Sequence, residues 1–212
     1  MPETLAPEKR AQSLSLRRIG RTTVEVIKIR PALGYTVIAG FVSGAHLGYL
    51  SSAQQVFQEQ SGLGELFPIY FAIIALALGL ASVLTARLVL RFGMRSLVRS
   101  ALLFMLGLAV AVFGISLLAA GQPPLWFLMV YLTLTFFCVG LLLGNNNALA
   151  MQPLGHIAGI GAARVGSLST LISVPLGVMI GRSYNGTVMP LIAGIAILAT
   201  LSLFVFHWIE AE

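Results

Sequence analysis

The fold is decided by the stretch PLWFLMVYLTLTFFCVGLLLG (Pro124–Gly144), because none of its 21 residues carries a charge. A helix needs about 20 apolar residues to cross the hydrocarbon core of a bilayer. Backbone groups in lipid must be paired within their own segment, which a helix achieves. A strand that crossed the membrane would show alternating side chains over about 10 residues instead. The stretch therefore predicts a transmembrane helix.

Five further apolar runs resemble this stretch, and turn or polar residues separate them. Hydrophobic residues make up 58 % of the 212-residue chain and charged residues 9 %, whereas a soluble domain carries about 25 % charged residues. The sequence predicts an all-α integral membrane protein, with one six-helix bundle over residues 31–212 and no strands. We expect its spans at residues 32–56, 66–88, 97–119, 124–148, 157–181 and 187–208.

The basic residues predict the orientation in the membrane. Seven of the 13 Lys and Arg residues lie in residues 1–30, which we interpret as a basic cytoplasmic linker segment, and four more lie in or beside the connection between the second and third spans. Lysine and arginine are enriched on the cytoplasmic side of membrane proteins. Both termini are therefore expected in the cytoplasm. The formal net charge of +6 is concentrated beside apolar runs, so it indicates membrane lipid and not nucleic acid as the partner.

Polar side chains within the spans are candidates for lining a substrate cavity. An amide or guanidinium group is costly in lipid unless it is partnered, so such a group faces protein or water. For each candidate a plainer role stays open, namely an interfacial anchor, a helix cap or packing contact, or an arginine that reaches the membrane surface. The candidates are Tyr49, Gln54, Gln55, Asn145, Asn146, Asn147 and Arg164.

The first span offers two further features. Gly40, Gly44 and Gly48 share one helix face, which allows another backbone to approach closely. This face is either a packing contact or a seam along which helices move. His46 is either a hydrogen-bonded packing residue or a proton carrier, because the imidazole pKa lies near neutrality.

A short basic segment between the second and third spans is a candidate gating loop. It comprises Arg87, Arg91, Gly93 and Arg95, with Arg99 following one turn later. Such a segment can hold neighbouring helix ends by bonding to carbonyls or carboxylates. The plainer interpretation is the positive-inside signal alone.

The missing residue types matter for function. The chain has no Asp and has no Glu between Leu66 and Ile209. No paired carboxylates, phosphate-binding loop or cluster of metal ligands is evident. The sequence therefore predicts a protein that is not an enzyme and needs neither a cofactor nor a metal.

Several stretches together resemble one family. Ala86–Arg95 (ARLVLRFGMR) is similar to the loop between helices 8 and 9 of major facilitator drug:proton antiporters of the Bcr/CflA type. Gly144–Gly159 (GNNNALAMQPLGHIAG) resembles that family's link between helices 10 and 11, and Tyr184–Thr187 resembles the link before helix 12. Met1–Leu5 is similar to the end of the family's sixth helix, and Tyr49–Ser51 is similar to a segment of its seventh.

This resemblance implies that the chain corresponds to helices 7–12 of a twelve-helix multidrug efflux transporter in a bacterial inner (plasma) membrane. The family's acidic coupling residues belong to the other half, which agrees with the lack of carboxylates in these spans. A small-molecule substrate and a second six-helix half, or a second copy of this chain, are the implied partners. The alternative is a membrane binding or scaffold protein, or a vestigial half without transport activity.

Overall fold

The computed structural model describes residues 28–211, without the side chains of residues 60 and 156–158, and over this range it is entirely helical. Six of its helices are long and apolar enough to cross a membrane, which confirms the predicted fold class. The expected basic linker lies almost wholly outside the described residues. The long helices are α2 (Arg30–Gln54), α3 (Phe67–Phe92), α4 (Met94–Leu118), α5 (Leu125–Met151), α6 (Ala158–Arg182) and α7 (Met189–Glu210).

The helix boundaries follow from local sequence chemistry. Pro31, Pro68 and Pro190 lie in the first turns of α2, α3 and α7, where a missing N–H costs no hydrogen bond. Gly93 alone separates α3 from α4 and has a φ of 78°, a conformation that glycine adopts without strain. A π-helical turn (Gln55–Gln60) extends α2, and a short 3₁₀ segment (Gln152–Ile157) joins α5 to α6.

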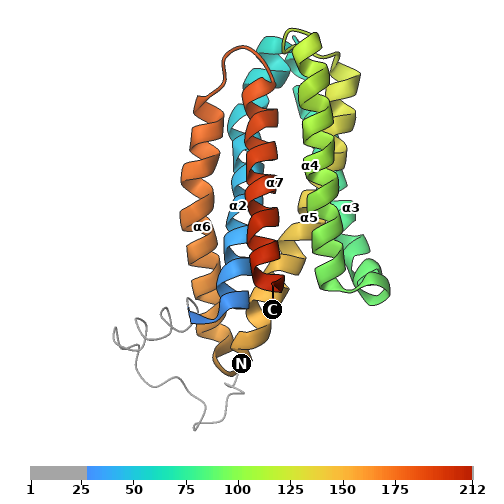
Figure 1. Cartoon of the computed structure of the whole chain (residues 1–212). Helices are drawn as coiled ribbons and strands as arrows, with labels where there is room; N and C mark the ends of the chain where they lie inside the picture. The colour runs from blue at the N-terminus through green and yellow to red at the C-terminus, as the bar shows by residue number, and fades with distance from the viewer. Residues whose placement is uncertain (1–27, 212) are drawn as a thin grey trace, which may run out of the picture.

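The helices stand side by side, and both Arg30 and Glu210 lie at the same end of the bundle (Figure 1). Helices α2 and α5 are central and pack on each other. In addition α2 packs on α6 and α7, α5 packs on α3 and α4, and α4 packs on α7. The helices form two units with matching contacts, in which α2 corresponds to α5, α3 to α6 and α4 to α7. When each helix is replaced by its counterpart, the set of main contacts stays the same.

Because each three-helix unit has an odd number of helices, the second unit begins on the opposite side of the membrane from the first. The bundle therefore consists of two inverted three-helix units, a plan common among transporters. The sequence has no clear internal repeat, so this symmetry lies in the packing of the helices and not in residue identities.

The predicted glycine face lies in the contact between α2 and α6. A Cβ atom added at Gly40 or Gly48 would lie 2.8 Å from an atom of Ile172 or Ile180, respectively. Both partners advance by eight residues, so α2 and α6 run parallel. On α6, a Cβ atom added at Gly177 would lie 2.5 Å from the Cβ atom of Leu47. The glycines are therefore packing contacts within the bundle.

Candidate functional site

The structure divides the candidate cavity residues between the two ends of the bundle. Tyr49, Gln54 and Gln55 lie toward the far end of α2, whereas the asparagines of α5 and Arg164 of α6 lie on either side of the Gln152–Ile157 connection. They do not form one cluster. A site that uses all of them would extend across the depth of the membrane.

Tyr49 is the centre of an aromatic cluster and not an open lining residue. Its side chain is only 2 % exposed. Its ring lies 4.5 Å from Phe136 and 6.0 Å from Phe71, measured between centroids, so it joins α2 to both α5 and α3. Its hydroxyl is buried without a hydrogen-bond partner among the described residues. His46 packs edge-on against the same Phe136 at 5.4 Å, but its buried Nδ1 atom lacks the expected hydrogen-bond partner among the described residues.

Gln54 and Gln55 lie where α2 changes to π-helical geometry. Gln54 is exposed, while the Oε1 atom of Gln55 is buried without a partner in the described part of the chain. The Tyr184 hydroxyl donates to the Gln55 carbonyl at 3.3 Å. Burial, and secondly the Glu59 carboxylate, raise the pKa of Tyr184, so the hydroxyl keeps its proton and remains a donor. This bond ties the end of α2 to the segment that follows α6.

The three asparagines of α5 have three different environments. Asn145 is buried and donates to the Leu141 carbonyl at 2.6 Å, and Asn147 is exposed and donates to the Leu143 carbonyl at 3.0 Å. Asn146 is fully buried, and neither amide atom has a partner within residues 28–211. Asn147 is therefore the asparagine available to a solute, and Asn146 is the one whose burial is costly.

Arg164 lies seven residues into α6 and is partly exposed. It has no ion pair or hydrogen bond with any described residue. One turn further on, α6 opens onto a groove of about 680 Å³ that includes Gly166, Ser167 and Thr170. Ser167 and Thr170 are exposed and donate to carbonyls of their own helix at 2.7 and 2.8 Å. The exposed side chains of α6 are thus small or polar as far as Thr170, whereas large apolar side chains, among them Leu171 and Met179, are exposed beyond it.

The basic segment is helical and not the expected loop. Arg87 and Arg91 belong to α3 and Arg95 belongs to α4, with Gly93 alone between the two helices. Arg95 pairs with the Glu210 carboxylate at 3.5 Å. The Tyr35 hydroxyl donates to the same carboxylate at 3.2 Å.

This carboxylate joins α2, α4 and α7 at one end of the bundle. Close by, the Arg30 guanidinium donates to the Trp208 carbonyl and lies 4.8 Å over the Trp208 ring. Of the predicted gating residues, Arg95 therefore contacts a neighbouring helix end, and the gating role of the segment stays a prediction.

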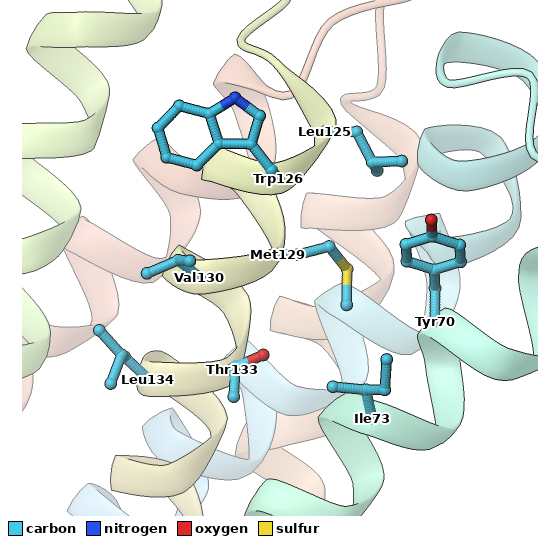
Figure 2. A pocket seen from close by; sticks show the side chains of 8 residues that line it. All are labelled: Tyr70, Ile73, Leu125, Trp126, Met129, Val130, Thr133 and Leu134. Carbon is cyan, nitrogen blue, oxygen red and sulfur yellow. The ribbon is translucent and has the colours of Figure 1, made fainter.

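Sequence reasoning missed a cleft of about 640 Å³ between α3 and α5. In Figure 2 Tyr70 and Ile73 face it from α3, and the Met129 side chain extends between the two helices. Its polar groups are the Tyr70 hydroxyl, the Thr133 hydroxyl and the Trp126 indole N–H. The signal available in the sequence was that the lining residues recur every three or four positions along two apolar helices, so that they share one face of each helix. The lining residues are Tyr70, Ile73, Leu125, Trp126, Met129, Val130, Thr133 and Leu134.

This arrangement, an inverted three-helix repeat with polar groups set within apolar helices, can be compared with known proteins. The chain is similar to a transporter. It is 28 % identical, over its entire length, to the uncharacterized MFS-type transporter YdgK of Bacillus subtilis (strain 168). The alignment covers 52 % of that protein, so the chain spans about half the length of the curated relative it matches. No family model matches the chain, and no solved structure matches it.

The similarity to an MFS-type transporter supports the sequence-based resemblance at the level of the superfamily. The narrower assignment to drug:proton antiporters of the Bcr/CflA type stays a prediction. No described residues gather into a group of three metal-binding side chains. The surface features that stand out are the apolar cleft, the small and polar first half of α6 and the basic residues beside Gly93.

Proposed function

We propose that this chain supplies one six-helix bundle of an MFS-type transporter that exports drugs or other small amphipathic molecules. A second six-helix bundle completes the alternating-access cavity. Two findings support the proposal, namely the similarity of the whole chain to about half of an MFS-type transporter and the inverted three-helix repeat in the packing. Transporters of this plan place the substrate between two bundles that rock against each other.

The exposed face of α6 is the observation that carries the proposal. Helices α3 and α6 occupy equivalent positions in the two three-helix units, and both are largely exposed. On α3 the exposed side chains include Leu76 and Val83, which are 71 % and 74 % exposed and suit lipid. On α6 the exposed side chains up to Thr170 are small or polar and include Ser167, whereas Leu171 and Met179 further along are 71 % and 64 % exposed. The first half of α6, with Arg164 nearby, is therefore suited to water or protein and poorly suited to lipid.

Several of the polar candidates have a role in this proposal. Arg164, Asn147 and Gln54 are available to bind the substrate or the water around it. Tyr49 supports the cavity wall through its ring contacts, and Arg95 holds the cytoplasmic helix ends through Glu210. The coupling carboxylates are supplied by the second bundle.

The described charges support an orientation in which α2 begins on the cytoplasmic side of a bacterial plasma membrane. One end of the bundle carries Arg87, Arg91 and Arg99 together with the Arg95–Glu210 pair. The connections at the other end carry Glu59, Glu65 and Arg182. This difference has the sign of the positive-inside rule.

Cysteine labelling in native membranes tests whether α6 lines a water-filled cavity. Ser167→Cys and Leu201→Cys are made separately in a Cys138→Ala background, which removes the single native thiol. Ser167 lies nine residues from the start of α6 and Leu201 nine residues from the end of α7, so both lie about 14 Å from the same end of the bundle. Both side chains are exposed. They therefore differ mainly in the face on which they lie.

We expect a charged, membrane-impermeant thiol reagent to label Ser167→Cys in membranes and to leave Leu201→Cys unlabelled until the protein is denatured. A substrate that occupies the cavity should slow the labelling of Ser167→Cys. Equal resistance at both positions would mean that α6 faces lipid, and the scaffold or vestigial interpretation would replace transport. An Arg164→Ala variant should also change substrate preference if Arg164 shares this face.

A further inference from the structure

Three exposed guanidinium groups lie around the turn between α3 and α4. Arg87 and Arg91 are four residues apart on α3, so they share a helix face, and Arg99 lies in the second turn of α4. All three are exposed. Because Gly93 is the only residue between the two helices, all three arginines lie within six residues of one tight turn.

These charges lack acidic partners in the described part of the chain. Glu210 is the acidic residue described at this end of the bundle, and it is bonded to Arg95 and Tyr35. Within residues 28–211 the other carboxylates, Glu59 and Glu65, lie in the connection between α2 and α3 at the opposite end. The positive charge of Arg87, Arg91 and Arg99 is therefore available to an external anion.

Apolar side chains are exposed beside the same arginines. Leu90 is 89 % exposed and Phe92 is 53 % exposed. The Arg91 guanidinium lies 5.3 Å over the Phe92 ring. Because α3 ends here after crossing the membrane, the arginines, Leu90 and Phe92 all lie near one membrane surface, where guanidinium groups meet lipid headgroups and apolar side chains meet acyl chains.

We propose that this turn, comprising Arg87, Leu90, Arg91, Phe92 and Arg99, binds an anionic phospholipid through its headgroup phosphate. Guanidinium groups form paired hydrogen bonds to phosphate oxygens. A free phosphate ion would leave Leu90 and Phe92 without a contact, whereas a phospholipid occupies both parts of the surface. This inference does not depend on transport, so either can fail without the other.

Lipid retention tests the proposal on the purified full-length chain. The protein is titrated with phosphatidylglycerol or phosphatidylcholine, and native mass spectrometry counts the lipids that remain bound. We expect one phosphatidylglycerol to be retained in preference to phosphatidylcholine. A basic residue near the membrane surface contributes about 1 kcal/mol to binding acidic lipid, so Arg91→Gln should weaken retention about fivefold.

The matched control is Arg182→Gln, which removes one exposed arginine at the opposite end of the bundle and should leave retention unchanged. Arg91→Lys keeps the charge but loses the paired hydrogen bonds, so it should weaken retention less than Arg91→Gln does. Leu90→Ser keeps every charge and should still weaken retention, because it removes acyl contact. Inorganic phosphate should not displace the lipid.

If Arg91→Gln and Arg182→Gln lose lipid retention equally, the effect depends only on the net charge of the protein, and the proposal is overturned. Displacement by inorganic phosphate would replace it with a simple anion site. Single substitutions of exposed residues are expected to leave folding intact, and the unfolding temperature in phosphatidylcholine nanodiscs checks this for each variant.

Discussion

Gly140 of α5 provides a sharp test of the helix packing. A Cβ atom added there would lie 2.5 Å from the Leu78 carbonyl oxygen of α3 and 2.8 Å from the Cβ atom of Ala81. Carbon–oxygen contacts between helices normally measure about 3.3–3.6 Å. The Gly140→Ala substitution therefore requires α3 and α5 to separate by about 1 Å at this point. The closest obstacle is backbone, which cannot move aside by changing rotamer.

The expected cost follows from two opposing effects. Inserting an extra methyl group into a packed contact costs about 1–3 kcal/mol, and replacing glycine by alanine within a helix recovers up to about 1 kcal/mol. We expect Gly140→Ala to lower the free energy of unfolding by about 1–2 kcal/mol. At about 2–4 °C per kcal/mol, the unfolding temperature should fall by about 2–8 °C.

Gly144→Ala is the control, because Gly144 lies one turn further along α5 with nothing within 4 Å of an added Cβ atom. It should be neutral or slightly stabilising. Thermal unfolding in detergent, followed by tryptophan fluorescence at one scan rate, measures both variants. Combining Gly140→Ala with Ala81→Gly removes the 2.8 Å contact but not the contact with the carbonyl, so recovery should be partial. If Gly140→Ala unfolds at the same temperature as Gly144→Ala, the close approach of α3 and α5 is refuted.

Three further outcomes are expected. A double-mutant cycle of Arg95→Gln and Glu210→Gln measures how strongly the two side chains stabilise the fold together. Because the pair is partly exposed, the coupling free energy should be about 0.2–1 kcal/mol. A coupling of zero would show that the pair does not hold α4 to α7. Asn146→Leu should raise the free energy of unfolding by about 1 kcal/mol, because it removes a buried amide without partners; a large destabilisation would instead indicate a bound water or ligand there. Liposomes that contain this chain alone should show no drug-driven proton flux by fluorescence quenching of a pH dye, because its spans lack carboxylates; such flux would disprove the assignment of coupling to a second bundle.

Much of the fold could be predicted because hydropathy alone requires it. Each span is long enough that the membrane leaves a helix as the workable structure for its backbone. The glycine face of α2 was also readable, since three glycines at four-residue spacing share one side of a helix. What the spacing could not identify was the partner, and Ile172 and Ile180 of α6 became neighbours only through the fold.

Features that join distant segments were beyond the sequence. Arg95 could be expected to hold a helix end, but its pairing with Glu210 depends on how α4 packs against α7. The cleft beside Tyr70 and Trp126 escaped notice because both residues lie in long apolar runs that suit lipid equally well. The amide of Asn146 illustrates the opposite case. A requirement for a partner could be stated from the sequence, yet the fold buries this amide without one among the described residues.

The contact between α2 and α6 indicates how the bundle would move. Side chains of α6 cover Gly40 and Gly48, while Leu47 and Ser51 of α2 cover Gly177 and Gly181 of α6. The two helices therefore interlock in both directions, and a shift of one residue along their axis would drive side chains into backbone. Sliding along this face is excluded while the helices stay in contact, so α2 and α6 move together. A bundle locked in this way suits rigid-body rocking against a second bundle, because its internal contacts persist while only the outer face of α6 changes its neighbours.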